Sequence, residues 1–234
     1  MLFDSLRSLL AGIPVSWESI LMQILATLFV IFCILPLHEF AHGWMAERLG
    51  DRTARAAGRL TLNPLASLDP MGALFLLLFG FGWAKPVPVN ARNFKNPKRD
   101  MAITALAGPV SNLLASLIGA ILYYALMLTV LPSAPEMVFT GVTSFFNAYI
   151  VINVALAAFN LLPIPPLDGS RIVSAFLPDR LMFAYYRYQN VIVMVLFLLL
   201  FSGVLSRPLA MIENAMLEGI LWLAALPFQW FGML

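Results

Sequence analysis

The stretch LPLHEFAHGW, residues 35–44, closes an almost unbroken apolar run that begins near residue 19. It holds both histidines of the chain, His38 and His42, together with an acidic residue, Glu39. The run is long enough to cross a lipid bilayer, which takes about 20 residues. Because ionisable side chains inside a bilayer are costly and typically functional, this stretch indicates a chemical site within a membrane-spanning helix.

The composition is that of an integral membrane protein. Hydrophobic residues make up 61% of the 234 residues and charged residues only 11%, against about 25% charged residues in soluble domains. The 14 basic and 12 acidic residues leave a formal net charge of +2. This excess is too small to indicate nucleic-acid binding, so we expect the lipid bilayer as the surroundings and no nucleic-acid partner.

The apolar stretches predict an all-α polytopic membrane protein with about five to six transmembrane helices. We expect one membrane-embedded domain over 1–234 with core helices at 17–49, 101–131 and 137–162, a short re-entrant or β-like segment at 70–95, and C-terminal helices within 188–231. The apolar patch at 71–83 is short, and the one at 208–231 contains two glutamates. The sequence therefore leaves open whether either patch spans the bilayer completely.

The spacing of the two histidines is typical of a zinc site. On a helix, His38 and His42 lie four residues apart, so their rings share one face and are able to hold one ion between them. In the pattern H-E-x-x-H, two neutral imidazoles bind Zn²⁺, and the glutamate accepts a proton from the water that attacks a carbonyl carbon. We therefore predict zinc ligands at His38 and His42 and a catalytic general base at Glu39. The alternative, interior histidines without a metal, is disfavoured by the cost of ionisable groups in lipid.

A catalytic zinc ion takes three protein ligands, so a third donor is expected elsewhere in the chain. Cys33 lies five residues before His38, about 140° around the helix, and faces elsewhere. Asp168 follows three prolines in NLLPIPPLDGSR, residues 160–171, where irregular backbone presents a carboxylate. Alone, Asp168-Gly169 is equally typical of a turn that ends a helix. Combined with H-E-x-x-H, it predicts Asp168 as the third zinc ligand.

Three motifs, in this order, resemble the site-2 protease family of intramembrane zinc metalloproteases: HEFAH at 38–42, GPVSN at 108–112 and NLLPIPPLDG at 160–169. Members of that family cut transmembrane segments of other proteins. The resemblance implies a transmembrane protein as substrate. Family members often carry a PDZ or a cystathionine-β-synthase-type domain, for which this chain has no room, so it is similar to the minimal members.

The resemblance also implies roles for individual residues. It assigns one zinc ion per chain to His38, His42 and Asp168 and the general base to Glu39. It further places two asparagines at the cleft as substrate-binding residues, Asn112 and Asn160, the latter binding the scissile peptide or its oxyanion.

The asparagines also have a plainer interpretation. Asn153 and Asn160 recur at seven residues on one helix face, and such amides form hydrogen bonds between membrane helices. Asn112 belongs to a stripe of small residues that suits close helix packing. Asn112 and Asn160 are therefore candidates for structural hydrogen bonding as well as for substrate binding.

The zinc prediction constrains the topology. If residues 70–84 crossed the bilayer, His42 and Asp168 would approach opposite surfaces, and no ion would bridge them. If this patch dips in and returns, both motifs share one side. That side then collects 12 of the 14 basic residues: Arg48, Arg52, Arg55, Arg59, Lys85, Arg92, Lys95, Lys98, Arg99, Arg171, Arg180 and Arg187. The positive-inside rule makes this side cytoplasmic, and we expect a prokaryotic plasma (inner) membrane.

The predicted function is zinc-dependent hydrolysis of peptide bonds in or near transmembrane segments. One alternative is a transporter or proton relay, because buried His, Glu and Asp also mark ion pathways. Against it, the sequence has few spans, no inverted repeat, and a histidine spacing that a relay does not require. A second alternative is a membrane protein that binds zinc for regulation without proteolysis.

Overall fold

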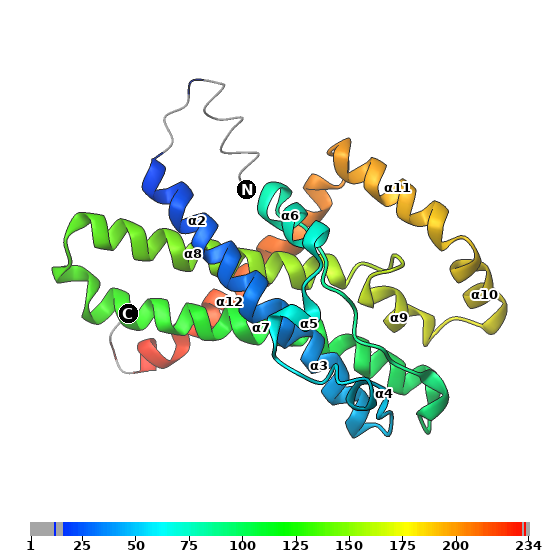
Figure 1. The fold of residues 1–234 in the computed structure, drawn as a ribbon. Coiled ribbons are helices and arrows are strands. Elements are labelled where there is room, and N and C mark those ends of the chain that lie inside the picture. Colours follow the sequence, from blue (N-terminus) through cyan, green and yellow to red (C-terminus); the bar gives the residue numbers. More distant parts are fainter. Residues whose placement is uncertain (1–11, 13–15, 231, 233–234) are drawn as a thin grey trace.

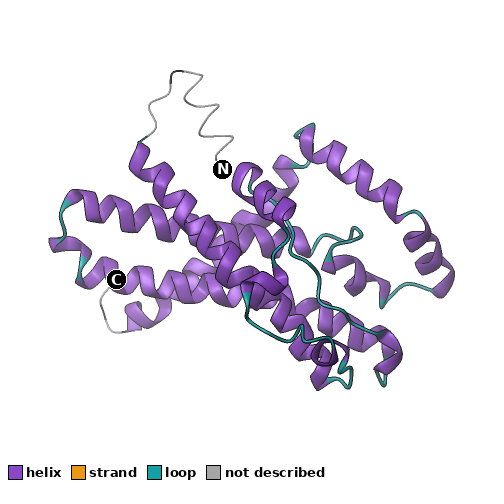
Figure 2. Cartoon of the chain, viewed as in Figure 1, coloured by secondary structure: helices purple, strands orange, loops and turns teal. Residues whose placement is uncertain are grey.

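A computed structural model describes residues 12, 16–230 and 232 (Figure 1). The described residues form helices joined by loops, and none of them forms a strand (Figure 2). The long helices are α2 (Trp17–Phe29), α3 (Leu35–Arg48), α7 (Pro97–Thr129), α8 (Glu136–Asn160), α11 (Gln189–Phe201) and α12 (Ser206–Trp230). The shorter elements are η1 (Val30–Ile34), α4 (Thr53–Ala56), α5 (Pro64–Ser67), α6 (Pro70–Phe79), η2 (Ala91–Asn93), η3 (Leu131–Ser133), α9 (Asp168–Ser174) and α10 (Asp179–Arg187).

The described helices include four that are long and apolar enough to cross a membrane: 17–48, 97–129, 136–160 and 206–230. A fifth span is added if α10 and α11, which meet at a bend of 61°, form one broken span. The predicted all-α polytopic class is confirmed. The number of spans is four or five, against the expected five to six. Residue 231, the last of the expected C-terminal segment, lies outside the described residues.

The first span is continuous from α2 to α3, although Pro36 lies inside it. Proline has no backbone N–H and disturbs the preceding helical turn. Here the turn before it, η1, is a π-helix, in which the wider hydrogen-bond spacing accommodates the disturbance. The span ends at Arg48 with Leu49 as its C-cap, and Gly50 follows with a positive φ of 111°, which favours glycine.

The centre of the fold is an antiparallel pair of long helices, α7 and α8, crossed by α2 and α3 (Figure 1). Small residues bring α7 and α8 close together. The Tyr149 hydroxyl donates to the Ala115 carbonyl at 3.1 Å, and the Ser116 hydroxyl donates to the Ile150 carbonyl at 3.2 Å. These contacts fix the register of the pair that carries one side of the site described below.

The expected re-entrant segment begins with helix α6. Its ten residues rise about 15 Å, roughly half the hydrocarbon thickness, so α6 is too short to cross. The helix ends at Gly80, with a φ of 83°, and the chain returns as an extended segment, residues 81–90, which we call the strap. A Cβ on Gly72 of α6 would lie 1.9 Å from the Trp83 carbonyl oxygen, so α6 and the strap are in direct contact. The β-like part of the expectation thus takes the form of extended chain not paired into a sheet.

The far end of the strap is tied to the end of α3 by Asp51, which is fully buried. Its carboxylate accepts hydrogen bonds from the backbone N–H of Asn90 at 2.7 Å, the Asn93 side-chain amide at 2.7 Å, and the N–H and hydroxyl of Thr53. Burial alone raises the pKa of this carboxyl group, but the hydrogen bonds outweigh it and hold the pKa below its ordinary value of 3.8. Ionised Asp51 therefore stabilises the fold above that pH, and the contribution is lost as the pH falls toward the lowered pKa.

We expect Asp51→Asn to lower the free energy of unfolding by about 1–3 kcal/mol at neutral pH, because an amide N–H then faces the Asn90 N–H. The difference from the wild type should shrink as the pH falls below about 4, the ordinary aspartate pKa, toward the lowered pKa, because protonation removes the wild-type advantage. Denaturant unfolding in detergent measures it. Asp69→Asn, which keeps the N-cap of α6, is the matched control. A difference that does not change with pH would refute the role of the charge.

Candidate metal centre

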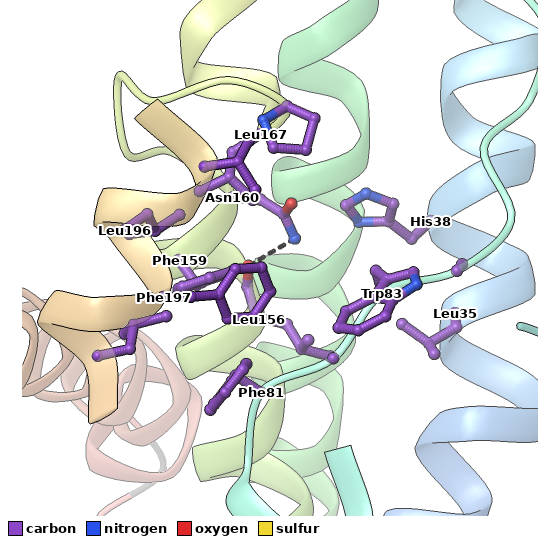
Figure 3. Close-up of a pocket in the computed structure, with 15 residues that line it drawn as sticks. Leu35, His38, Phe81, Trp83, Leu156, Phe159, Asn160, Leu167, Leu196 and Phe197 are labelled. Atoms are coloured by element: carbon purple, nitrogen blue, oxygen red, sulfur yellow. Dashed lines mark hydrogen bonds between the residues drawn. The ribbon is translucent and has the colours of Figure 1, made fainter. Parts of the chain in front are cut away.

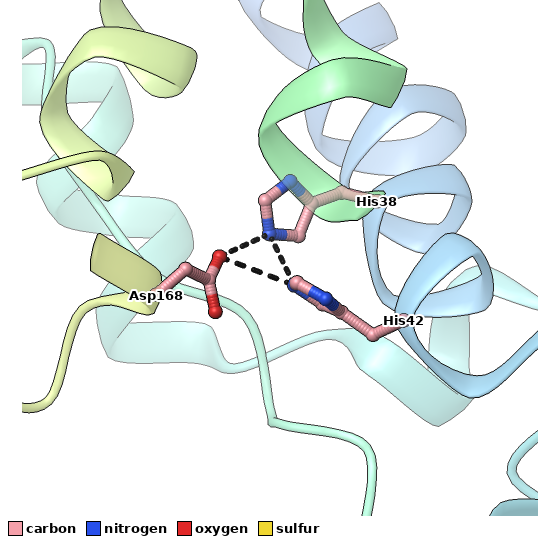
Figure 4. A group of neighbouring side chains, drawn as sticks. All are labelled: His38, His42 and Asp168. Carbon is pink, nitrogen blue, oxygen red and sulfur yellow. Dashed lines mark hydrogen bonds and ion pairs between the residues drawn. The ribbon is translucent and has the colours of Figure 1, made fainter. Parts of the chain in front are cut away.

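Helix α3 and the start of α9 bring three potential ligands together (Figure 4). The Nε2 atoms of His38 and His42 lie 3.0 Å apart, and Oδ2 of Asp168 lies 3.3 Å and 3.2 Å from them. One ligand atom from each residue lies within 4.8 Å of the others, and all three residues are buried. The structure therefore brings together the two histidines and the distant aspartate that the sequence singles out.

Hydrogen bonds on the far side of each imidazole fix its orientation. His42 Nδ1 lies 2.8 Å from the Thr104 carbonyl oxygen, and His38 Nδ1 lies 2.7 Å from Asn112 Oδ1. A carbonyl oxygen only accepts, so each Nδ1 carries the proton and each Nε2 presents its lone pair to the other two ligands. Two lone pairs and a carboxylate at such short range favour a cation between them.

The donor set therefore fits a metal ion. Two imidazole nitrogens and one carboxylate oxygen are typical ligands of catalytic zinc, which keeps its fourth position for water or substrate. Hydrogen bonds from ligand histidines to carbonyl oxygens are a regular feature of such sites.

Gly108 explains the first half of the motif GPVSN. A Cβ at this position would lie 2.3 Å from His42 Nε2 and 2.6 Å from His38 Cε1, so the α7 backbone passes directly against both imidazoles. Asn112 follows one turn later on the same face and reaches His38. Gly108 thus allows α7 to approach the imidazoles, and Asn112 orients the His38 ring.

Asp168 is placed by the proline-rich loop after α8. This helix ends at Asn160, and the chain turns through residues 161–167 before Asp168 opens α9. A Cβ on Gly169 would lie 2.2 Å from the Leu161 carbonyl oxygen. Only glycine allows the turn to close this tightly, and the closed turn directs the Asp168 carboxylate toward α3.

Glu39 lies beside the metal-binding cluster and is held by the strap. Its Oε2 accepts a hydrogen bond from the backbone N–H of Val87 at 2.7 Å, and both residues are buried. One carboxylate oxygen is thereby fixed, and Oε1 is left for other chemistry. The partner is a backbone group, which no residue type in the sequence indicates.

A cavity of about 320 Å³ opens beside His38 (Figure 3). Its walls come from α3, the strap, the end of α8, the proline-rich loop and α11. The lining is mostly apolar and aromatic, and its polar side chains are those of His38 and Asn160. The Asn160 side-chain nitrogen donates to the Leu156 carbonyl at 2.9 Å, which leaves its oxygen as the atom available for other contacts.

The two predicted substrate-binding asparagines differ in position. Asn160 lines the cavity, whereas Asn112 is fully buried against His38 and is not among the residues that line it. A direct contact of either residue with substrate stays a prediction. Sequence reasoning missed Thr104 and Val87, because both act through backbone atoms. It also missed Asp51, whose hydrogen bonds tie the strap to the end of α3.

Fold and site together define a class: a polytopic membrane protein with a buried cluster that is able to bind a metal ion of the kind used for hydrolysis. Comparison with known proteins gives the family. Residues 26–203 match the family described as Peptidase family M50. The chain belongs to this family, the site-2 proteases, and the resemblance seen in the sequence is confirmed.

The similar proteins carry matching names. "Putative zinc metalloprotease YwhC" of Bacillus subtilis is 39% identical over 217 residues, which cover 90% of this chain and 94% of that protein. "Putative zinc metalloprotease Rip2" of Mycolicibacterium smegmatis is 32% identical over 161 residues, 67% of this chain and 58% of that protein. "Putative zinc metalloprotease MJ0611" of Methanocaldococcus jannaschii is 33% identical over 137 residues, 58% of this chain and 62% of that protein. No solved structure matches the chain significantly.

These findings establish the enzyme class. The protein is an integral membrane zinc metalloprotease with a protein substrate. The predictions of a metalloprotease and of zinc as the cofactor are confirmed at this level, and the transporter alternative is not supported.

Proposed function

We propose that the protein hydrolyses peptide bonds within or next to transmembrane segments of other membrane proteins. His38, His42 and Asp168 bind one zinc ion, and Glu39 is the general base. The observation that carries the proposal is the position of the cluster. His42 lies six residues and His38 ten residues before the end of α3 at Arg48, about 9 and 15 Å along a helix of membrane-spanning length.

Zinc bound at this cluster would supply a Lewis acid that polarises the scissile carbonyl and activates water. Glu39 receives the proton of the attacking water at Oε1, because its Oε2 is held by the Val87 N–H. The strap thus holds the base in a fixed orientation beside the cluster.

The lining of the cavity favours an apolar substrate segment. Apart from His38 and Asn160 it presents apolar and aromatic side chains, which suit a peptide from a transmembrane helix. In such a helix the peptide groups are hydrogen-bonded internally, so the segment unwinds locally before attack. Asn160, at the cavity wall, binds the exposed peptide group of the unwound segment.

The orientation follows from the basic residues. Arg48, Arg52, Arg55 and Arg59 follow the catalytic helix, and further lysines and arginines occupy 85–99, so we place the metal centre toward the cytoplasmic side. The expected membrane is the prokaryotic plasma membrane.

The proposal is tested with purified protein in proteoliposomes and a panel of single-span membrane substrates. We expect cleavage within or beside the span, located by mass spectrometry, which stops when zinc is chelated and returns when zinc is restored. His38→Ala should bind no zinc and cleave nothing. Wild-type protein that holds one zinc ion but cleaves none of the panel would favour the regulatory alternative, and cleavage of unfolded soluble peptides alone would overturn the substrate class.

A further inference from the structure

The buried polar atoms near the metal centre that have no hydrogen-bond partner among the described residues include one amide nitrogen and one amide oxygen. They are Nδ2 of Asn112, a donor, and Oδ1 of Asn153, an acceptor. Both side chains are fully buried. Such groups are costly to leave unpaired, so an unpaired donor and an unpaired acceptor in one interface call for a common explanation.

The register of α7 and α8 places these two residues at the same level. Ser116 pairs with Ile150, and Ala115 pairs with Tyr149. The helices are antiparallel, so one turn toward the metal centre leads from Ser116 back to Asn112 and from Tyr149 on to Asn153. The Asn153 side-chain nitrogen already donates to the Tyr149 carbonyl at 2.9 Å, which leaves its oxygen as the free end of the amide.

We propose that Asn153 is a positioning residue for the metal centre. Its Oδ1 accepts a hydrogen bond from Asn112 Nδ2, either after a small side-chain rotation or through one buried water. This bond fixes which end of the Asn112 amide faces His38.

The orientation of that amide decides the protonation of His38. With Oδ1 of Asn112 facing the ring, Nδ1 carries the proton and Nε2 keeps its lone pair. With the amide reversed, Nδ2 would donate to Nδ1, and the ring proton would move to Nε2, which then no longer binds a metal ion. The inference rests on the proposed role of His38 as a zinc ligand, and it extends the hydrogen-bonded chain from zinc to Tyr149 on α8.

The chain offers a direct readout because His38 and His42 are its only histidines. In zinc-free protein labelled with ¹⁵N-histidine, ring correlation spectra identify the tautomer of each imidazole at about pH 9, above the ordinary imidazole pKa of about 6.5. We expect both wild-type rings to be protonated at Nδ1. In Asn153→Leu, His38 should populate the Nε2-protonated tautomer, while His42, bonded to the Thr104 carbonyl, stays unchanged. Zinc affinity, measured by chelator competition, should fall about 10- to 100-fold.

Three further variants separate positioning from general stability. Tyr123→Phe removes another hydrogen bond between α7 and α8, the one from the Tyr123 hydroxyl to Thr143, and should leave the His38 tautomer and the zinc affinity unchanged. Asn153→Asp keeps an oxygen that accepts from Asn112 Nδ2 and should restore both. In an Asn112→Asp background either oxygen accepts from His38, so Asn153→Leu should cost no affinity.

The outcomes distinguish this inference from the proposed function. If the His38→Ala variant binds zinc as tightly as the wild type, His38 is not a zinc ligand and the proposed function is refuted. If His38→Ala abolishes zinc binding but Asn153→Leu keeps the wild-type tautomer and affinity, the positioning role is wrong. Should Asn153→Leu fail to fold, Asn153→Ala decides by the same two measurements.

Discussion

Glu39→Gln is expected to lower the turnover number for peptide cleavage by about a hundred- to ten-thousand-fold while zinc stays bound at one ion per chain. The amide oxygen of glutamine keeps the hydrogen bond from the Val87 N–H, so the side chain stays in place. It has no basic oxygen, so the attacking water loses its proton acceptor. Turnover of a reconstituted substrate and metal analysis of the same samples give both quantities.

The matched control is Glu47→Gln, two turns further along α3. Glu47 pairs with Arg55 near the membrane surface, away from the cluster, and such pairs contribute little. This variant should keep turnover within about twofold of the wild type. A Glu39→Gln enzyme that cleaves at the wild-type rate would assign the general base to another residue.

Gly108→Ala is expected to abolish zinc binding without unfolding the protein. The new methyl group would lie 2.3 Å from His42 Nε2 and 2.6 Å from His38 Cε1, inside van der Waals contact with both rings. Helix α7 or the rings must then move by more than the roughly 0.2 Å that metal–ligand distances tolerate. Zinc content after dialysis against a weak chelator measures the loss, and circular dichroism reports whether the helices persist.

Gly119→Ala supplies a control with a comparable overlap elsewhere on α7. Its methyl group would lie 2.4 Å from the Tyr149 ring, away from the imidazoles. This variant should lose stability but keep its zinc. Equal zinc loss in both variants would show that any overpacking of α7 disrupts the site, and the specific role of Gly108 would be lost.

Much of the centre follows from the sequence because its chemistry is carried by side chains. Two histidines at helical spacing in an apolar run identify a metal site, and the need for a third ligand directs attention to Asp168. The requirement that one ion bridge His42 and Asp168 also predicts that residues 71–83 do not cross, and the ten-residue length of α6 agrees with this.

The remaining features depend on backbone atoms and on tertiary register, which residue types do not encode. Every residue has a backbone carbonyl, and every residue except proline has a backbone N–H. Only the packing of α7 and the course of the strap therefore select the Thr104 carbonyl and the Val87 N–H. Asp51 lies outside the motifs, and its binding of Asn90, 39 residues later, depends on how the strap folds back. The sequence leaves Asn112 open between a substrate contact and structural hydrogen bonding, and only the structure gives its hydrogen bond to His38.

The most direct test of the account is X-ray absorption at the zinc edge of the detergent-solubilised, zinc-loaded protein. The account predicts two imidazole nitrogens at about 2.0–2.1 Å and carboxylate or water oxygens at about 2.0–2.2 Å, with one nitrogen ligand fewer or no zinc in His42→Ala. Scattering from sulfur at about 2.3 Å, or a spectrum that His42→Ala and Asp168→Ala leave unchanged, would place the metal elsewhere in the chain.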